Sequence, residues 1–497
     1  MRKTLLIHLL IVTLGGECAR ADVKLHGLFT NGAVLQQNRE VPVWGTGRDG
    51  EKVTVKFNGQ ELSATVRDGR WMVKLKPLKA GGPFTLTVAG DNTITLTNVL
   101  VGEVWLSSGQ SNMGFQLSRA SNAQEAIAAA NDPELRLFTV PHAATDAPLT
   151  DIGGEWKASS PATSAGFSAV SYFFGHDLRR ALKVPIGLID ASVGGTPAEA
   201  WTSRGSLESD PELKQILTSQ AEKVRTYDAA KAKEQYQRDL EKHAEAVKRA
   251  KAAGEPVPRA PAKPAQPDRV SKRPTGLYNA MIAPLEPYAL AGVIWYQGEA
   301  NTSRAAEYEK LFPALIHAWR EAWGQDDFPF LFVQIAPFQN MTPDIREAQL
   351  HTWKKVPMTA MVVTTDVGEA EDIHPKKKEP VGARLALAAR AIAYKEKLEY
   401  SGPVFEKMTV EKNLALLSFA HLGGGLIAQG GPLKGFTISA DNKTFLNAEA
   451  VIKGDTVEVS AKEVAKPVAV RYGWEHVPDV NLFNKAGLPA TPFRSKP

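Results

Sequence analysis

Residues 98–402 alternate apolar runs of strand length with amphipathic stretches of helical period. This pattern constrains the fold more than any other feature, because strands joined by crossover helices pair in parallel within one sheet. We therefore predict an α/β domain for this part of the chain. The predicted strands are residues 101–106, 184–190, 292–296, 328–335 and 360–365, and the predicted helices are residues 166–183, 304–323, 344–355 and 376–394.

The two regions that flank this domain alternate apolar and polar residues in short runs. Residues 52–56 (KVTVK) and 456–460 (TVEVS) are examples. Such runs, separated by turn residues, predict antiparallel strands with one buried face. We expect an N-terminal, sandwich-like β domain at residues 22–97 and a C-terminal β domain at residues 403–497, because a chain of 497 residues is too long for one core.

One segment of the α/β domain does not fit a compact sheet. Residues 212–253 contain no Gly or Pro and are rich in Ala, Glu, Lys, Gln and Arg, which predicts one long helix or a helical hairpin. Residues 254–274 are rich in Pro and Ala, which predicts a semi-stiff linker. We interpret residues 205–273 as an insertion between the second and third strands and expect a solvated appendage.

The first 21 residues have the features of a secretory signal peptide. Arg2 and Lys3 precede an apolar stretch at residues 5–14, and Ala19 and Ala21 form a small-x-small cleavage site. We expect cleavage after Ala21 and a secreted or periplasmic mature protein. No later apolar run approaches the roughly 20 residues that span a bilayer, so no membrane span is predicted.

Cys18 is the only cysteine of the chain, and it lies inside this signal. The exported protein is therefore not expected to contain disulfides or cysteine metal sites. A lipid anchor on Cys18 is a lesser alternative, because Glu17 is not the small or aliphatic residue that such an anchor needs before the cysteine.

The excess of basic residues belongs to one segment. The formal net charge is +5, and residues 241–273 carry nine Lys or Arg against four Asp or Glu. No groove pattern of interleaved basic and aromatic residues accompanies this charge, so nucleic acid is not an expected partner.

Polar and small residues follow the predicted strands at the points where the strands end. In a parallel sheet these ends meet at one edge, which is where open α/β proteins bind ligands. Ser111 follows the first strand, Gly194 and Gly195 follow the second, and Gln297 and Glu299 follow the third. Each has a plain structural explanation when taken alone: a helix cap, a turn, or hydrogen bonding within a loop.

His374 follows the fifth strand, in a loop with the carboxylates of Glu371 and Asp372. A carboxylate near a histidine can hold its Nδ1–H, which leaves Nε2 to take a proton from a serine such as Ser111. A surface loop or a weak metal site is the alternative. The chain has no HExxH motif and no supporting histidine spacing, so no metal is predicted.

Three blocks together resemble the signature of the sialate O-acetylesterase family, which is part of the SGNH (GDSL-like) hydrolase superfamily. They are residues 109–113 (GQSNM), residues 295–299 (WYQGE), and residues 372–375 (DIHP) with Lys378, Gly382 and Arg384 downstream. The resemblance implies an SGNH-type, three-layer, doubly wound parallel sheet. It extends over nearly the whole mature chain, through residues 28–36, 41–45, 274–284, 477–482 and 487–489.

The resemblance also implies roles for the residues of the predicted triad. Ser111 would be the nucleophile and His374 the general base. Asp372 is the favoured orienting acid. Glu371 stays open, because the superfamily often places the acid three residues before the histidine.

An oxyanion hole is implied beside the nucleophile. It would combine the Ser111 N–H, a backbone N–H at Gly194 or Gly195, and the Gln297 side chain, which stands where superfamily relatives use an asparagine. Three further residues would hold these groups in place without reacting: Gln110, Asn112 and Glu299.

The expected activity is that of a serine esterase that removes O-acetyl groups from carbohydrate through an acetyl-enzyme, without a cofactor. Its partner would be an acetylated glycan, either sialic acid or a plant or microbial polysaccharide, and the sequence leaves the sugar and the oligomeric state open. The alternatives are a non-catalytic carbohydrate-binding protein and an esterase that acts on a non-carbohydrate ester. The joint presence of the serine, glutamine and histidine blocks favours catalysis.

Overall fold

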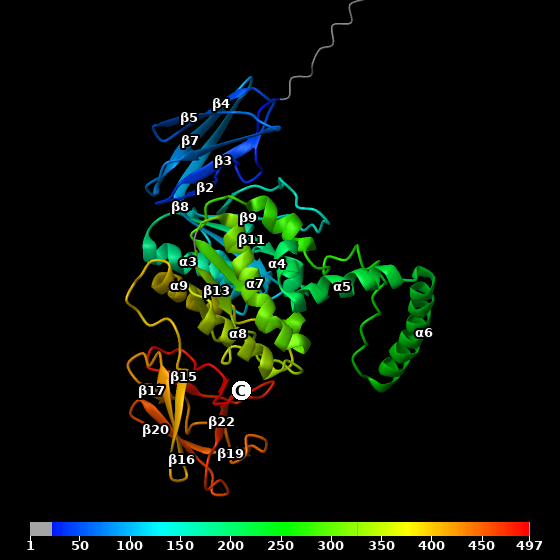
Figure 1. Ribbon diagram of the computed structural model, residues 1–497, viewed down its shortest axis with the longest axis vertical. Helices are drawn as coiled ribbons and strands as arrows, with labels where there is room; N and C mark the ends of the chain where they lie inside the picture. Colours follow the sequence, from blue (N-terminus) through cyan, green and yellow to red (C-terminus); the bar gives the residue numbers. More distant parts are fainter. Residues whose placement is uncertain (1–21, 326, 497) are drawn as a thin grey trace, which may run out of the picture.

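The computed structural model of the protein describes residues 22–325 and 327–496. The N-terminal β strands, the α/β domain and the C-terminal β strands follow one another along the long axis (Figure 1). The predicted signal peptide, residues 1–21, lies outside the described residues. Within the described part of the chain, no helix has both the length and the apolar character needed to cross a bilayer.

Strand β8 (Thr93–Gly109) runs through two parts of the molecule. Its first half pairs antiparallel with β7 (Gly81–Ala89), and its second half pairs parallel with β11 (Ile186–Ser192) and β12 (Gly292–Tyr296). The division predicted between residues 97 and 98 therefore falls inside one continuous strand. Since both sheets share its backbone, the N-terminal part and the α/β domain are joined without a linker.

The central sheet has the order β10-β9-β11-β8-β12-β13-β14. The five predicted strands, β8 and β11 to β14, take the order second, first, third, fourth, fifth, as in a doubly wound sheet. Two further strands were not predicted. The edge strand β10 runs antiparallel, so the sheet is mixed rather than purely parallel. The other strands of this sheet are β9 (Asp132–Thr139), β10 (Lys157–Ser159), β13 (Phe330–Val333) and β14 (Thr359–Val362).

Helices cover both faces of this sheet. Ile294 of β12 belongs to the core beneath α3 and α9, whereas its neighbour Trp295 belongs to the core beneath α7 and α8. Both faces are apolar because successive residues of a strand point to opposite sides. The bounds are α3 (Ala169–Leu182), α9 (Glu379–Ile392), α7 (Ala305–Trp323) and α8 (Pro343–Lys355), with shorter helices α1 (Ala123–Ala129), α2 (Pro161–Ser164), α4 (Arg204–Ser209), η1 (Leu117–Arg119), η2 (Ala198–Trp201), η3 (Tyr278–Ile282), η4 (Ala283–Leu285) and η5 (Glu299–Arg304).

The N-terminal part contains strands with one buried side. In β4 the side chains of Val53, Val55 and Phe57 are buried while the residues between them are more exposed, which is the expected alternation of an antiparallel sheet. One small sheet has the order β1-β3-β6; β2 and β7 pair with β8, and β4 pairs with β7 and β5. These strands are β1 (Lys24–Leu25), β2 (Val34–Gln36), β3 (Val41–Thr46), β4 (Lys52–Phe57), β5 (Gln60–Thr65) and β6 (Arg70–Leu75).

The C-terminal part is a set of small antiparallel sheets around a core of its own. Arg494 attaches it to the α/β domain, because its guanidinium donates two hydrogen bonds, of 2.7 and 2.6 Å, to the Glu347 carboxylate of α8. The strands are β15 (Val404–Glu411), β16 (Leu414–Ala420), β17 (Leu426–Ala428), β18 (Phe436–Ser439), β19 (Leu446–Asn447), β20 (Glu449–Lys453), β21 (Thr456–Ser460), β22 (Ala469–Tyr472), β23 (Leu482–Asn484) and β24 (Phe493–Arg494).

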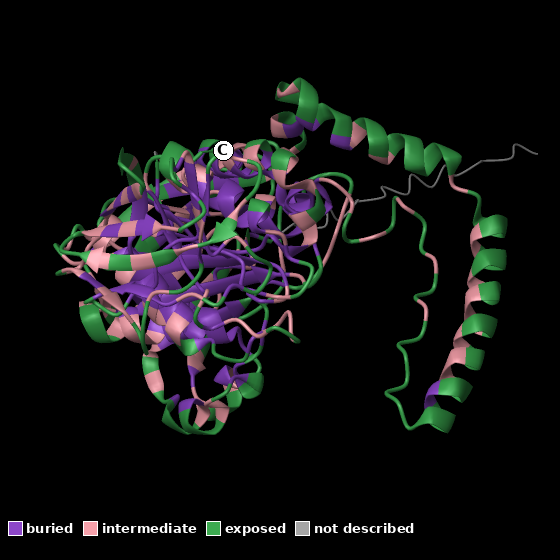
Figure 2. Ribbon diagram, turned by 90° about the horizontal axis from the view of Figure 1, so that it is seen from below, coloured by how far each residue is buried: buried purple, intermediate pink, exposed green. Residues whose placement is uncertain are grey.

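The predicted insertion forms an arm that projects from the α/β domain (Figures 1 and 2). Helices α5 (Pro211–Thr226) and α6 (Ala229–Ala253) meet at an angle, so the arm is neither one long helix nor a hairpin. The break occurs where the Asp228 carboxylate accepts hydrogen bonds from the first N–H groups of α6 and so caps a new helix. Residues 255–266 then return toward the body without regular structure.

Candidate active site

The central sheet brings the predicted site residues to one edge. Gly109 of β8 pairs with Ser192 of β11 and with Tyr296 of β12, so these three strands end at the same level. β13 and β14 continue the sheet in parallel. The loops after four of the strands carry Ser111 (after β8), Gly194 (after β11), Gln297 (after β12) and His374 (after β14).

Gly109 makes the sharp turn that leads from β8 to Ser111. Its φ is +132°, and a Cβ at this position would lie 2.2 Å from the Tyr296 carbonyl oxygen. Only glycine permits so close an approach of two backbones. The next residue, Gln110, donates its backbone N–H to the same carbonyl at 2.9 Å, which fixes the start of the serine loop against β12.

Ser111 and His374 meet although 263 residues separate them. Ser111 Oγ lies 2.7 Å from His374 Nε2, which is hydrogen-bond distance. Burial lowers the pKa of His374 below its ordinary value, Asp372 raises it, and the cations Lys378 and Arg119 lower it further. The imidazole is therefore biased toward the neutral form, which can accept the serine proton.

The two candidate acids differ in what they face. Asp372 Oδ1 accepts the His374 backbone N–H at 2.8 Å and lies 3.8 Å from His374 Nδ1. Glu371 instead accepts a hydrogen bond of 2.7 Å from Gln339 Nε2. Asp372 thus lies beside the imidazole, at a distance longer than a hydrogen bond, whereas Glu371 is held by another loop.

The two predicted oxyanion glycines also differ. A Cβ on Gly194 would lie 3.4 Å from Ser111 Cβ, so this backbone is in contact with the predicted nucleophile. A Cβ on Gly195, whose φ is +69°, would instead lie 3.8 Å from Lys272 Nζ. Both glycines are exposed, which leaves the space beside Ser111 open to a substrate.

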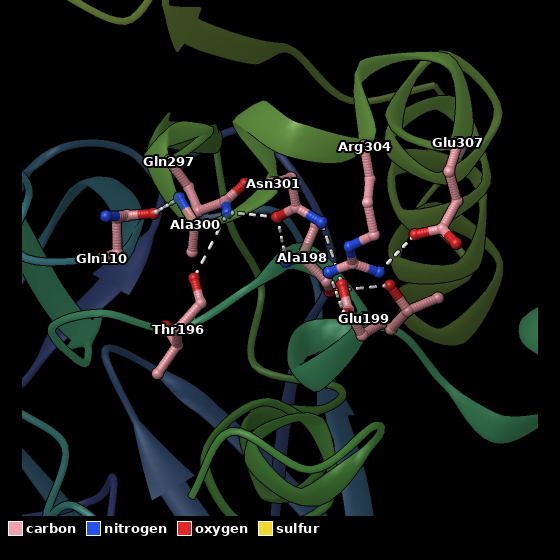
Figure 3. Close-up of polar contacts among 10 residues, drawn as sticks. Gln110, Thr196, Ala198, Glu199, Gln297, Ala300, Asn301, Arg304 and Glu307 are labelled. Carbon is pink, nitrogen blue, oxygen red and sulfur yellow. Dashed lines mark hydrogen bonds and ion pairs between the residues drawn. The ribbon is translucent and has the colours of Figure 1, made fainter. Parts of the chain in front are cut away.

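Gln297 is fully buried, and its amide is used within the protein. Its Nε2 donates to Asn301 Oδ1 at 2.7 Å and to the Thr196 carbonyl oxygen at 3.2 Å (Figure 3). Both N–H groups of the amide therefore face protein acceptors, and Gln297 joins the loop after β12 to the loop after β11. Donation from Gln297 to an oxyanion stays a prediction that requires one of these bonds to be exchanged.

A network around Asn301 extends this connection. Its Oδ1 also accepts the Ala198 N–H at 2.9 Å, and its Nδ2 donates to Glu199 at 3.0 Å. Arg304 pairs with both Glu199 and Glu307 (Figure 3). These contacts were not predicted, because nothing in the sequence spacing links Glu199 to the glutamine block.

The three predicted holding residues are buried and hydrogen-bonded within the site. Gln110 Oε1 accepts the Ala300 N–H at 3.2 Å. Asn112 Nδ2 donates to Glu299 Oε1 at 2.6 Å and to the Ile373 carbonyl oxygen at 3.0 Å. These bonds connect the serine loop both to the loop after β12 and to the loop that carries His374.

Two exposed cations lie near the serine and the histidine. Lys272, from the end of the arm segment, is beside Gly195, and no carboxylate among the described residues pairs with it. Arg119 lies over the Phe115 ring at 4.6 Å, and its charge lowers the pKa of His374. Neither cation was predicted as a site residue. Lys272 was overlooked because it lies in a segment interpreted as a linker.

Candidate metal ligands are not grouped at this edge. Among the described residues, no three His, Cys, Asp or Glu side chains gather in an arrangement that could hold an ion.

Comparisons with known proteins find acetylesterases among the relatives of this chain. The family model described as "Carbohydrate esterase, sialic acid-specific acetylesterase" matches residues 267–391, which include Gln297 and His374. The chain is 32% identical over 469 residues to the sialate O-acetylesterase of Rattus norvegicus, with 84% of this chain and 82% of that protein covered. It is 33% identical over 439 residues to the Homo sapiens enzyme, with 79% and 75% covered.

A solved structure shares the full architecture. The crystal structure of a carbohydrate acetylesterase from Xanthomonas citri is 38% identical, with a TM-score of 0.81, and the match covers 95% of this chain and 99% of that one. The similarity therefore includes both flanking β regions as well as the central sheet.

Proposed function

Because this chain belongs to the sialate O-acetylesterase family, and is therefore a carboxylic ester hydrolase, we propose that it removes O-acetyl groups from carbohydrate through an acetyl-enzyme formed on Ser111. The observation that carries this proposal is the 2.7 Å contact between Ser111 Oγ and His374 Nε2. We also assign the central domain to the SGNH type. The strand order and the position of the site at the strand ends support this assignment.

The proposed reaction follows serine-hydrolase chemistry. His374 Nε2 takes the proton as Ser111 Oγ attacks the acetyl carbonyl, and the sugar hydroxyl leaves with that proton. Water, activated by His374, then cleaves the acetyl-enzyme and releases acetate. The backbone N–H groups of Ser111 and Gly194 are the best-placed donors for the oxyanion, because Gly194 contacts the nucleophile.

The pH dependence follows from the direction of the pKa shift on His374. The imidazole must be neutral to act as a base, and burial together with two cations lowers its pKa below 6.5. We expect kcat/KM for p-nitrophenyl acetate to stay on its plateau to pH values below 6.5 and to fall only under more acidic conditions. An acid limb centred above pH 7 would contradict this assignment of the base.

The cations beside the site support an acidic, acetylated sugar as the substrate. A carboxylate bound between Ser111 and the exposed Lys272 would find a cation that has no protein partner among the described residues. We expect Lys272→Ala to raise KM for an O-acetylated acidic sugar by about two- to fivefold, the usual size of an exposed charge contact, and to leave kcat unchanged.

The matched control for this prediction is Lys263→Ala, which removes an equally exposed charge from the same segment. Steady-state acetate release would be measured with an acetylated acidic sugar and with an acetylated neutral xylo-oligosaccharide. An equal rise in KM for both substrates would remove the support for an acidic sugar and leave the esterase assignment intact.

We further propose that the protein is exported. The positively charged start at Arg2 and Lys3, the apolar stretch at residues 5–14 and the small residues Ala19 and Ala21 support this proposal.

A further inference from the structure

One buried cluster joins the three loops that carry the proposed catalytic residues. Asn112, directly after Ser111, is at its centre and donates to Glu299 of the β12 loop and to the Ile373 carbonyl of the histidine loop. The third contact of its amide is to Lys378, whose Nζ donates to Asn112 Oδ1 at 2.5 Å. Lys378 is four residues after His374, immediately before α9.

Lys378 is an unusual cation for this position, because its side chain is completely buried. Its ammonium lies 4.8 Å from the centre of the Phe115 ring and 5.3 Å from that of Tyr296, both within the range of cation–π attraction. Burial lowers the pKa of Lys378 to about 7, and the nearby Glu299 carboxylate opposes that shift. A buried charge is retained only at a cost, so its location calls for an explanation beyond packing.

The ammonium also determines how the Asn112 amide is oriented. An ammonium only donates hydrogen bonds, so it requires the amide oxygen on its side. The amide nitrogen is then directed at the Glu299 carboxylate and at the Ile373 carbonyl, which both only accept. A flipped amide would lose all three hydrogen bonds, so Asn112 connects the serine loop to the histidine loop only in this orientation.

We propose that Lys378 is a positioning residue of the esterase: it orients Asn112 so that the His374 loop is held against Ser111. This inference rests on the proposed function, since it assumes that the serine and histidine carry out the hydrolysis.

The charged groups that face His374 give the sign of the expected change. Asp372 raises the pKa of the imidazole, whereas Lys378 and Arg119 lower it, in addition to the effect of burial. Removal of the Lys378 charge therefore raises the pKa of His374. Because the neutral form is the active base, the acid limb of the pH–rate profile moves to higher pH.

The test compares Lys378→Met with Lys377→Met. Both remove one lysine charge from adjacent positions, but Lys377 is exposed and is not among the groups that shift the pKa of His374. We expect Lys378→Met to move the acid limb of kcat/KM for p-nitrophenyl acetate up by about half a pH unit or more. We also expect a fall in kcat of about tenfold to a hundredfold from the displaced histidine, with KM little changed.

The expected result for Lys377→Met is wild-type behaviour in both measurements. If Lys378→Met and Lys377→Met have the same pH profile and the same kcat, Lys378 does not position the site. If Lys378→Met fails to fold, the double variant Glu299→Gln/Lys378→Met removes both buried charges together, and the same upward shift of its acid limb is required. An unshifted limb in that variant overturns the inference.

Labelling by a serine-directed phosphonate separates this inference from the proposed function. Lys378→Met should still be labelled completely at Ser111, although more slowly. If the wild-type protein were not labelled at Ser111, the proposed function itself would fail. Full labelling with an unchanged pH profile in Lys378→Met would overturn only the role of Lys378.

Discussion

Replacement of Ser111 by alanine is expected to lower kcat for p-nitrophenyl acetate by about 10⁴- to 10⁶-fold, the range found when the nucleophile of a serine hydrolase is removed. The reason is that Ser111 Oγ is the hydroxyl that lies 2.7 Å from His374 Nε2, where the imidazole can take its proton. The variant should also lose acetate release from acetylated oligosaccharides and covalent labelling by a phosphonate.

The matched control for Ser111→Ala is Ser118→Ala, which removes the hydroxyl of an exposed serine of η1 in the same segment after β8. This control should keep wild-type kcat. Both variants should unfold at the wild-type temperature, because Ser111 is only half-buried and its hydroxyl contact is to the half-buried His374. Most of the activity surviving in a folded Ser111→Ala protein would refute the proposed nucleophile.

Replacement of Asp372 by asparagine is expected to lower kcat by about 10²- to 10⁴-fold, because the carboxylate that faces Nδ1 stabilises the imidazolium formed during the reaction. The structure places Asp372 Oδ1 3.8 Å from Nδ1, and a modest closure would complete that contact. Since Asp372 raises the pKa of His374, its loss should also move the acid limb of the profile to lower pH, opposite to the shift expected for Lys378→Met.

Glu371→Gln is the control that decides between the two candidate acids. It removes the neighbouring carboxylate, which accepts from Gln339 rather than from the histidine. We expect its kcat to stay within about twofold of the wild type, the size of most surface substitutions. A large loss in Glu371→Gln together with a small loss in Asp372→Asn would reverse the assignment of the acid.

Much of the central fold follows from local patterns in the sequence. The five predicted strands overlap β8, β11, β12, β13 and β14, because a buried parallel strand is a continuous apolar run that needs no tertiary information to recognise. The short edge strand β10 was missed, since three residues give no periodic signal. The position of the break between α5 and α6 was not predicted, because it depends on a single capping aspartate within a helix-forming composition.

The residues of the site were found for a related reason. Ser111, Gly194, Gln297 and His374 each follow a strand, and the parallel sheet requires those strand ends to share one edge. The pairing of His374 with Ser111 was expected, whereas the hydrogen-bond partners of the Gln297 amide could not be predicted. The Gln297 amide turns toward Asn301 in its own loop and toward the Thr196 carbonyl in the loop after β11, which the sequence does not connect to it.

The sequence by itself determined the five parallel strands, the family and the strand ends at which chemistry is located, because these depend on patterns local to each segment. The tertiary structure alone decided that Asp372 rather than Glu371 faces His374, that Gly194 rather than Gly195 contacts Ser111, and that Lys378 is buried beneath both loops. The physical reason is that side-chain direction, burial and charge neighbours depend on how separate segments of the chain pack against one another.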